Sequence, residues 1–178
     1  MCIRDRGDLF AVAQNTDLAR QRYAEALSHD PRNSDALTGL ANLAYDADDY
    51  GAALQGYNRA LAVATSPGQA TLRATLQRRI DTVQKEMTIE ANFITISDHL
   101  GRFKISFPRD LPKSVVASSL QTLNEAYQRV GRDFDFHPAG LVTVKVYSRR
   151  QLSSVQQIPP WVVGLFDGKI RLLDERLL

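Results

Sequence analysis

Cysteine and histidine are scarce in this 178-residue chain, and their scarcity excludes several kinds of site. The one cysteine, Cys2, excludes an internal disulfide framework. The three histidines, His29, His99 and His137, have no partner at metal-ligand spacing, and we expect each to be an exposed loop residue. The chain also has no phosphate loop, no glycine fingerprint and no Ser-His-Asp set. We therefore predict no metal site, no cofactor and no catalytic residue within these residues.

Long apolar runs and an excess of one charge are also missing. No run of about 18 apolar residues occurs, so we expect no membrane-spanning helix in this chain. Arg4, Asp5, Arg6 and Asp8 interrupt the N-terminal region, which therefore does not resemble a secretory signal. Lys and Arg together number 22 against 20 Asp and Glu. This balance gives no reason to expect nucleic acid as a partner.

The composition differs between the two halves of the chain. Residues 1–88 hold 16 of the 20 alanines, whereas residues 89–178 hold 9 of the 12 valines and 6 of the 7 phenylalanines. Alanine favours helix, and valine and phenylalanine favour strands. The predicted fold class is therefore an all-α part followed by an α+β part: helical hairpins, then a mixed domain with a hairpin, a helix and further strands.

The first six residues, MCIRDR, resemble translated sequencing-adapter sequence, and we interpret residues 1–6 as non-native. The alternative is a frayed native terminus. If the segment is non-native, an export signal before residue 7 would also be missing. The sequence then does not specify the cellular compartment, and a periplasmic or other extracytoplasmic location is compatible with it.

A 34-residue repeat runs through the first half. Residues at one helix face recur at this offset: Ala19, Tyr23, Ala26 and Leu27 correspond to Ala53, Tyr57, Ala60 and Leu61. Small alanines allow a neighbouring helix to approach closely, and the tyrosine fills the space beside them. Pro31 lies between the copies, where one helix must end before the next begins.

Seven positions have the spacing expected for the two helices of one repeat. They are Leu37, Leu40 and Ala41 on the first helix and Tyr50, Ala53, Tyr57 and Ala60 on the second. This pattern resembles the tetratricopeptide repeat (TPR), a helix-turn-helix unit of the same length. Asp48 and Asp49 lie at the turn, where the second helix needs an N-cap acceptor. The resemblance implies a protein or peptide partner. We assign residues 7–88 to TPR-like helical repeats with a capping helix.

The capping helix is predicted between Ser66 and Met87, with Ser66 and Pro67 at its N-cap and first turn. One face is apolar: Leu72, Leu76, Ile80 and Val83. The other face is basic: Arg73, Arg78, Arg79 and Lys85. This basic face is either a ligand groove or the solvated face of a capping helix, and we favour the second interpretation.

From residue 89 the pattern changes from helical to alternating periodicity. Gly101 lies in a short turn between two extended runs, where a positive φ is needed. The predicted elements are a hairpin (92–97 and 102–107), a helix after Pro112 that ends at Gly131, a strand (141–147), a short helix (149–155) and an edge strand (168–172). This order predicts an α+β domain.

The most specific segment of this half is Trp161 to Leu172, WVVGLFDGKIRL. Together with the hairpin, the Ala126-Tyr127 helix and the strand that ends in Val146-Tyr147, it resembles the opening of the bacterial peptidase MA-like domain. These domains are gluzincin-type zinc metallohydrolases, often preceded by TPR repeats. The resemblance covers about residues 89–174, and we assign residues 89–178 to a partial α+β peptidase MA-like domain.

The resemblance implies an HExxH zinc helix shortly after the 168–172 strand, but this chain has no HExxH. We therefore interpret the chain as the N-terminal fragment of a TPR-containing zinc metallopeptidase-like protein, catalytically incomplete as given. Zinc is expected only in a longer parent. The alternative is a non-enzymatic TPR adaptor with a structural α+β domain.

In gluzincins the edge strand before the zinc helix pairs with the substrate backbone. Transferred to this chain, that role implies six peptide-binding residues: Trp161, Phe166, Asp167, Gly168, Lys169 and Ile170. The alternative is that Trp161 and Phe166 are core aromatics and that Asp167-Gly168 is a simple turn. We also expect an uncovered apolar end at four leucines: Leu172, Leu173, Leu177 and Leu178.

Overall fold

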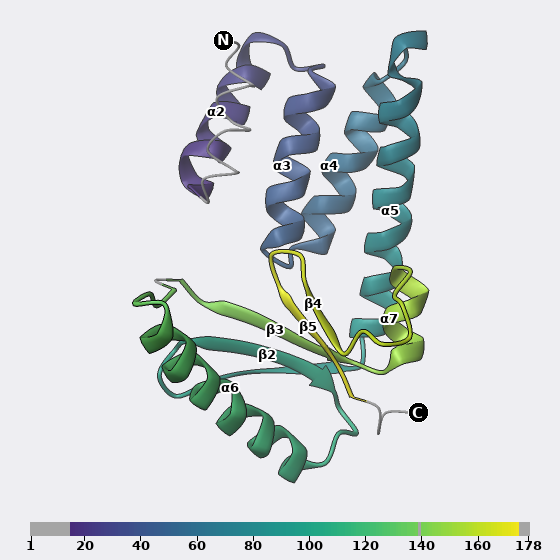
Figure 1. The fold of residues 1–178 in the computed structure, drawn as a ribbon. Coiled ribbons are helices and arrows are strands. Elements are labelled where there is room, and N and C mark those ends of the chain that lie inside the picture. The colour runs from purple at the N-terminus through teal and green to yellow at the C-terminus, as the bar shows by residue number, and fades with distance from the viewer. Residues whose placement is uncertain (1–14, 139, 175–178) are drawn as a thin grey trace. The chain divides into compact units, whose positions relative to one another are not determined.

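Three N-terminal helices each begin next to an Asn or Asp side chain that caps them. The computed structural model describes residues 15–138 and 140–174, and it begins with α2 (Thr16–His29), α3 (Ser34–Asp46) and α4 (Tyr50–Val63) (Figure 1). The caps and the amides they accept from are Asn15 with Leu18 (3.3 Å), Asn33 with Ala36 (2.9 Å) and Asp49 with Ala52 (2.9 Å). Each cap satisfies a backbone donor that has no partner within its helix.

The chain divides into two compact units between Thr88 and Ile89. The segment 1–6, which we predicted to be non-native, lies outside the described residues, as do Leu177 and Leu178.

Close helix packing in the first unit depends on small side chains. Two clusters are buried: Ala19, Tyr23, Ala26, Ala36 and Leu43 in one, and Leu37, Ala41, Ala44, Ala53, Tyr57, Ala60, Leu76, Ile80 and Val83 in the other. A Cβ at Gly39 would overlap the Tyr23 ring, and one at Gly56 would come within 2.8 Å of the Ala41 Cβ. These two glycines therefore allow the helices to approach one another.

The predicted capping helix is present and begins with a capping box. Ser66 and Gln69 form this box around a short 3₁₀ turn (Pro67–Gln69), which leads into α5 (Ala70–Glu90). Leu76, Ile80 and Val83 are buried in the core of the first unit. The four basic residues of the other face are all exposed, as a solvated face requires: Arg73, Arg78, Arg79 and Lys85.

The second unit is built on a five-stranded sheet. The strands are β1 (Phe93–Ser97), β2 (Phe103–Pro108), β3 (Val142–Tyr147), β4 (Gly164–Phe166) and β5 (Ile170–Leu173), in the order β1-β2-β3-β5-β4. β2, β3 and β5 are parallel, whereas β1 and β4 run antiparallel to their neighbours. Helices α6 (Lys113–Asp133) and α7 (Arg149–Val155) complete the unit. The predicted fold class is confirmed.

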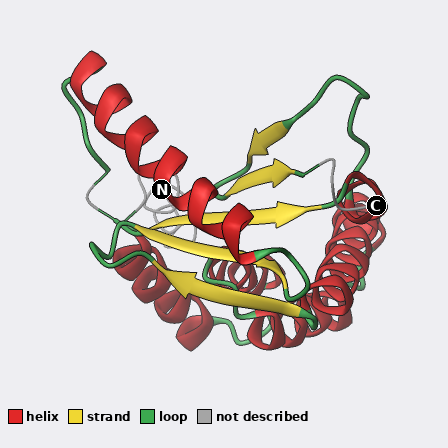
Figure 2. Ribbon diagram, turned by 90° about the horizontal axis from the view of Figure 1, so that it is seen from below, coloured by secondary structure: helices red, strands yellow, loops and turns green. Residues whose placement is uncertain are grey.

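Alternation along the strands gives the sheet one apolar face. Phe103, Ile105, Phe107, Val144 and Val146 are buried there and pack against the apolar stripe of α6. That stripe contains Val116, Leu120, Leu123 and Tyr127. Figure 2 views the sheet with α6 lying across it. The intervening residues of β3 and β5, including Lys145 and Arg171, must lie on the opposite face.

The prediction that residues 168–172 form an edge strand is wrong. β5 lies between β3 and β4, and the edge strand is β4, which the sequence pattern did not reveal. The alternation of Lys169, Ile170 and Arg171 shows that a strand is present, but it carries no information about the strand's neighbours. β4 has only three residues, too few to show a period.

Two turn predictions have different outcomes. Gly101 has φ +66°, as its place in the β1–β2 turn predicted. Helix α6, however, ends at Asp133 and not at Gly131. The glycine has a different role there, because a Cβ at this position would overlap the imidazole ring of His137.

Candidate functional site

The outer edge of the sheet at β4 has backbone groups that point away from β5. Val163 O accepts from Leu173 N (2.9 Å), and Asp167 N donates to Lys169 O (3.3 Å). In an antiparallel pair the residues that bond to the neighbour alternate with residues that bond outward. The N–H and C=O groups of Gly164 and Phe166 therefore face away from β5.

Exposed aromatic side chains accompany this open edge. Trp161 is 79% exposed and Phe166 is 71% exposed. The interpretation of these two residues as core aromatics is therefore wrong. Phe166 pairs across the sheet with Ile170, which packs against the core below α6, so both side chains lie on the α6 face. The structure thus brings Phe166 and Ile170 together.

The other predicted peptide-binding residues do not share this surface. Asp167 accepts from Arg171 Nε at 2.9 Å, and Gly168 has φ +96°, so both serve the β4–β5 turn. The Lys169 side chain is buried. Gly164, which the sequence did not single out, lies against β5, because an added Cβ would come within 3.0 Å of Arg171 O.

A chain of polar contacts crosses the opposite face of the sheet. Arg171 Nη1 donates to the Tyr147 hydroxyl at 3.2 Å, and that hydroxyl donates to Glu90 Oε1. Lys145 Nζ donates to the same carboxylate. Lys145 and Arg171 are each only 1% exposed. Buried charges of this kind require matched partners, and the sequence pattern alone did not identify them.

The histidines are dispersed over the molecule. His29, His99 and His137 are exposed, as predicted, although His29 is the last residue of α2 and not a loop residue. The His137 ring lies against Tyr127 with 5.0 Å between ring centroids. Among residues 15–138 and 140–174, no group of three or more His, Cys, Asp or Glu side chains could hold a metal ion.

In the first unit, the seven residues that suggested a repeat lie in the contacts between helices. Leu37, Ala41, Ala53, Tyr57 and Ala60 are buried, and Leu40 and Tyr50 are half-buried. The Tyr57 hydroxyl donates to Asn42 Oδ1 at 2.7 Å. Burial raises the pKa of Tyr57 to about 12. A comparison with protein-family models matches this segment to the tetratricopeptide repeat. Residues 13–76 contain a TPR.

The TPR indicates a role in protein–protein interaction. The match spans α2, α3, α4 and the start of α5, and the seven positions given above lie on α3 and α4. The family match ends at residue 76 and does not extend to the sheet. No curated protein and no solved structure matches the chain. In the part of the chain that the structure describes, no helix is long and apolar enough to cross a membrane.

Proposed function

We propose that this chain is the N-terminal part of a TPR-containing zinc metallopeptidase-like protein, and that β4 pairs with an extended peptide by strand addition. The observation that carries the docking part of the proposal is the antiparallel edge strand β4, which turns the backbone groups of Gly164 and Phe166 away from β5. The metallopeptidase part is supported only by the sequence resemblance of residues 89–174. An exposed strand edge is a template for another extended chain.

The side chains near this edge support recognition of apolar peptide residues. In an added strand, alternate side chains lie on the two faces of the sheet. Those on the α6 face would lie beside Phe166, with Ile170 one strand further into the sheet. The peptide backbone supplies the hydrogen bonds, and Phe166 supplies apolar contact area.

Catalysis requires residues that this chain does not contain. Without HExxH the chain has neither the two zinc ligands nor the glutamate that activates water. The proposal therefore assigns peptide docking to these residues and assigns zinc and hydrolysis to a longer parent.

Peptide docking can be tested by removing one outward-facing backbone N–H group, that of Phe166. We would measure the binding of fluorescent extended peptides to the full chain, to Phe166→Ala and to Phe166→Pro. Alanine removes the ring but keeps the outward N–H, whereas proline also removes that donor without removing a bond to β5. We expect Phe166→Pro to bind at least about tenfold more weakly than Phe166→Ala, since such a loss corresponds to roughly one hydrogen bond. Equal binding by the two variants would exclude strand addition at this position.

The zinc chemistry is tested separately. Extending the reading frame in the source genome should reveal HExxH in the codons that follow Leu178. A downstream sequence without this motif would remove the metallopeptidase part of the proposal and would leave peptide docking to be judged by the binding measurement.

A TPR adaptor is the second candidate function, and the family match at residues 13–76 favours it. In this case the partner binds to the repeat helices and the sheet is a structural domain. A partner that residues 7–88 retain as well as the full chain does would support the adaptor. Loss of that partner from residues 7–88 would count against it.

A further inference from the structure

The apolar face of the sheet is wider than the one helix that covers it. α6 is about 10 Å wide, and neighbouring strands are about 4.8 Å apart, so one helix covers about two strands. The apolar stripe of α6 packs with the buried residues of β2 and β3, and Ile170 and Leu172 of β5 lie at the margin of this cluster, where they are half-buried. In Figure 2 the two short strands at the edge of the sheet, β5 and β4, lie beside the helix and not beneath it. The remaining half of this face therefore has the width of one more helix.

A groove lies where this second helix would pack. It has a volume of about 630 Å³ and lies between the C-terminal half of α6 and the sheet, with Phe103 of β2, Val142 of β3 and Ile170 of β5 on the sheet side. Leu123, Ala126 and Val130 line it on the α6 side. Phe134, which follows α6, also lines the groove and is 77% exposed. On β4, Phe166 lies on the same face of the sheet, because it pairs with Ile170.

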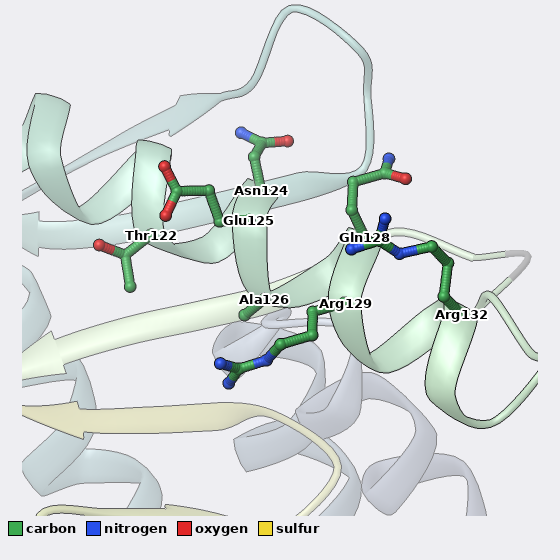
Figure 3. Close-up of a pocket in the computed structure, with 7 residues that line it drawn as sticks. All are labelled: Thr122, Asn124, Glu125, Ala126, Gln128, Arg129 and Arg132. Atoms are coloured by element: carbon green, nitrogen blue, oxygen red, sulfur yellow. The ribbon is translucent and has the colours of Figure 1, made fainter.

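The helix that borders the groove contributes positive charge. Figure 3 shows Ala126 and Arg129 on one flank of α6, with Asn124 and Gln128 on the other. Ala126 lines the apolar groove and, together with Arg129, also lines the neighbouring hollow on the outer side of α6, so Arg129 lies next to the wall of the groove. Within the described residues, the side chains of Arg129 and Arg132 form no ion pair or hydrogen bond with another residue. Glu125 accepts from Gln121 at 2.8 Å.

We propose that the β4–β5 half of the α6 face binds one amphipathic helix of a partner protein. Its apolar side covers Val130, Ile170 and Phe166, and carboxylates along one flank face Arg129. The width of the uncovered face specifies a helix, and the Arg129 guanidinium, which no described residue pairs with, specifies the acidic flank. This inference does not depend on the metallopeptidase proposal.

Two synthetic peptides of about four helical turns would test the proposal on the full chain. Both carry leucines at i, i+3, i+4 and i+7, with glutamates along one flank in the first peptide and lysines in the second. Fluorescence anisotropy should show at least about fivefold tighter binding of the glutamate peptide. Val130→Asp should weaken its binding at least about tenfold, because it places a charge in the apolar groove.

Charge reversal provides the sharper measurement. Arg129→Glu should reverse the preference, so that the lysine peptide binds more tightly than the glutamate peptide. Lys113→Glu, an exposed change at the other end of α6, should leave the preference unchanged. Circular dichroism confirms that each variant is folded. Equal binding of the two peptides, no binding, or a concentration-dependent dimer that Val130→Asp abolishes would each overturn the proposal.

Discussion

The amino group of Lys145 lies 2.7 Å from Glu90 Oε2 and 3.0 Å from Glu90 Oε1. The same carboxylate accepts a hydrogen bond from the Tyr147 hydroxyl. Glu90 is the last residue of α5, and Lys145 lies in the middle of β3. The contact therefore ties the start of the second unit to the centre of its sheet, on the face opposite α6.

Replacing Glu90 should destabilise the second unit. Glu90→Gln removes the negative charge beside a buried ammonium group, and we expect a loss of about 3 kcal/mol in the free energy of unfolding. Urea denaturation followed by the NMR signals of the sheet amides would measure this loss. The double variant Glu90→Gln with Lys145→Met removes both charges and should be more stable than Glu90→Gln alone. If the double variant is the less stable of the two, the pair does not act as a charge pair.

Gly39 and Gly51 form a matched pair of helix glycines. Gly39→Ala should cost about 2 kcal/mol, because its Cβ overlaps the buried Tyr23 ring. At Gly51 the nearest atom to an added Cβ is Asp49 Oδ1 at 3.7 Å. Gly51→Ala should therefore stabilise by about 0.5 kcal/mol through helix propensity. Thermal unfolding of both variants measures the difference, and similar melting temperatures would show that Tyr23 can move aside.

The Asp98 carboxylate should make stability depend on acid pH. It accepts from the backbone amides of Phe103 (2.8 Å) and Arg102 (2.6 Å), and these hydrogen bonds, that of Phe103 most, hold its pKa below the usual value. A carboxyl with a lowered folded pKa stabilises the fold above its unfolded pKa of about 3.9 and loses that contribution as the pH falls further. We expect Asp98→Asn to lose this dependence below about pH 4. Unfolding curves of both proteins at several acid pH values would measure it, and parallel pH profiles would contradict the prediction.

Tyr57 should titrate later than an ordinary tyrosine. Its pKa is raised from 10.0 to about 12, chiefly by burial. Because the folded pKa exceeds the unfolded one, this contribution to stability is complete below pH 10 and is lost between pH 10 and 12. NMR of ¹³C-labelled tyrosine, with Tyr57→Phe to assign the signal, follows the titration directly. A Tyr57 signal that titrates near pH 10 would contradict the buried geometry.

The repeat unit could be predicted from the sequence because its signal is local. Ala53, Tyr57 and Ala60 lie on one helix face, and their spacing is sufficient to predict burial. The strand order of the second unit could not be predicted. It depends on which strand inserts beside β3, and the alternation of a strand identifies its two faces but not its neighbours.

The candidate edge could be located only in part. The resemblance to the peptidase MA-like domain implies Phe166 and Ile170 as peptide-binding residues, and the structure places them side by side. Lys169 was chosen with them, yet its side chain is buried, which is rare for lysine and has no signature in a single sequence. Lys145 and Arg171 were missed for the same reason.

The position of β5 also has a consequence for how the second unit folds. β4 precedes β5 in the chain but lies outside it in the sheet, so β4 has no partner until β5 is present. Only three residues, 167–169, connect the two strands, and they can form a hairpin by local contacts before either strand reaches β3. Pairing of β3 with β5 closes a much longer loop, which is slow. In a refolding experiment, amides of the helical repeat should therefore become protected from hydrogen exchange first, and those of β4 and β5 should become protected together in the last phase.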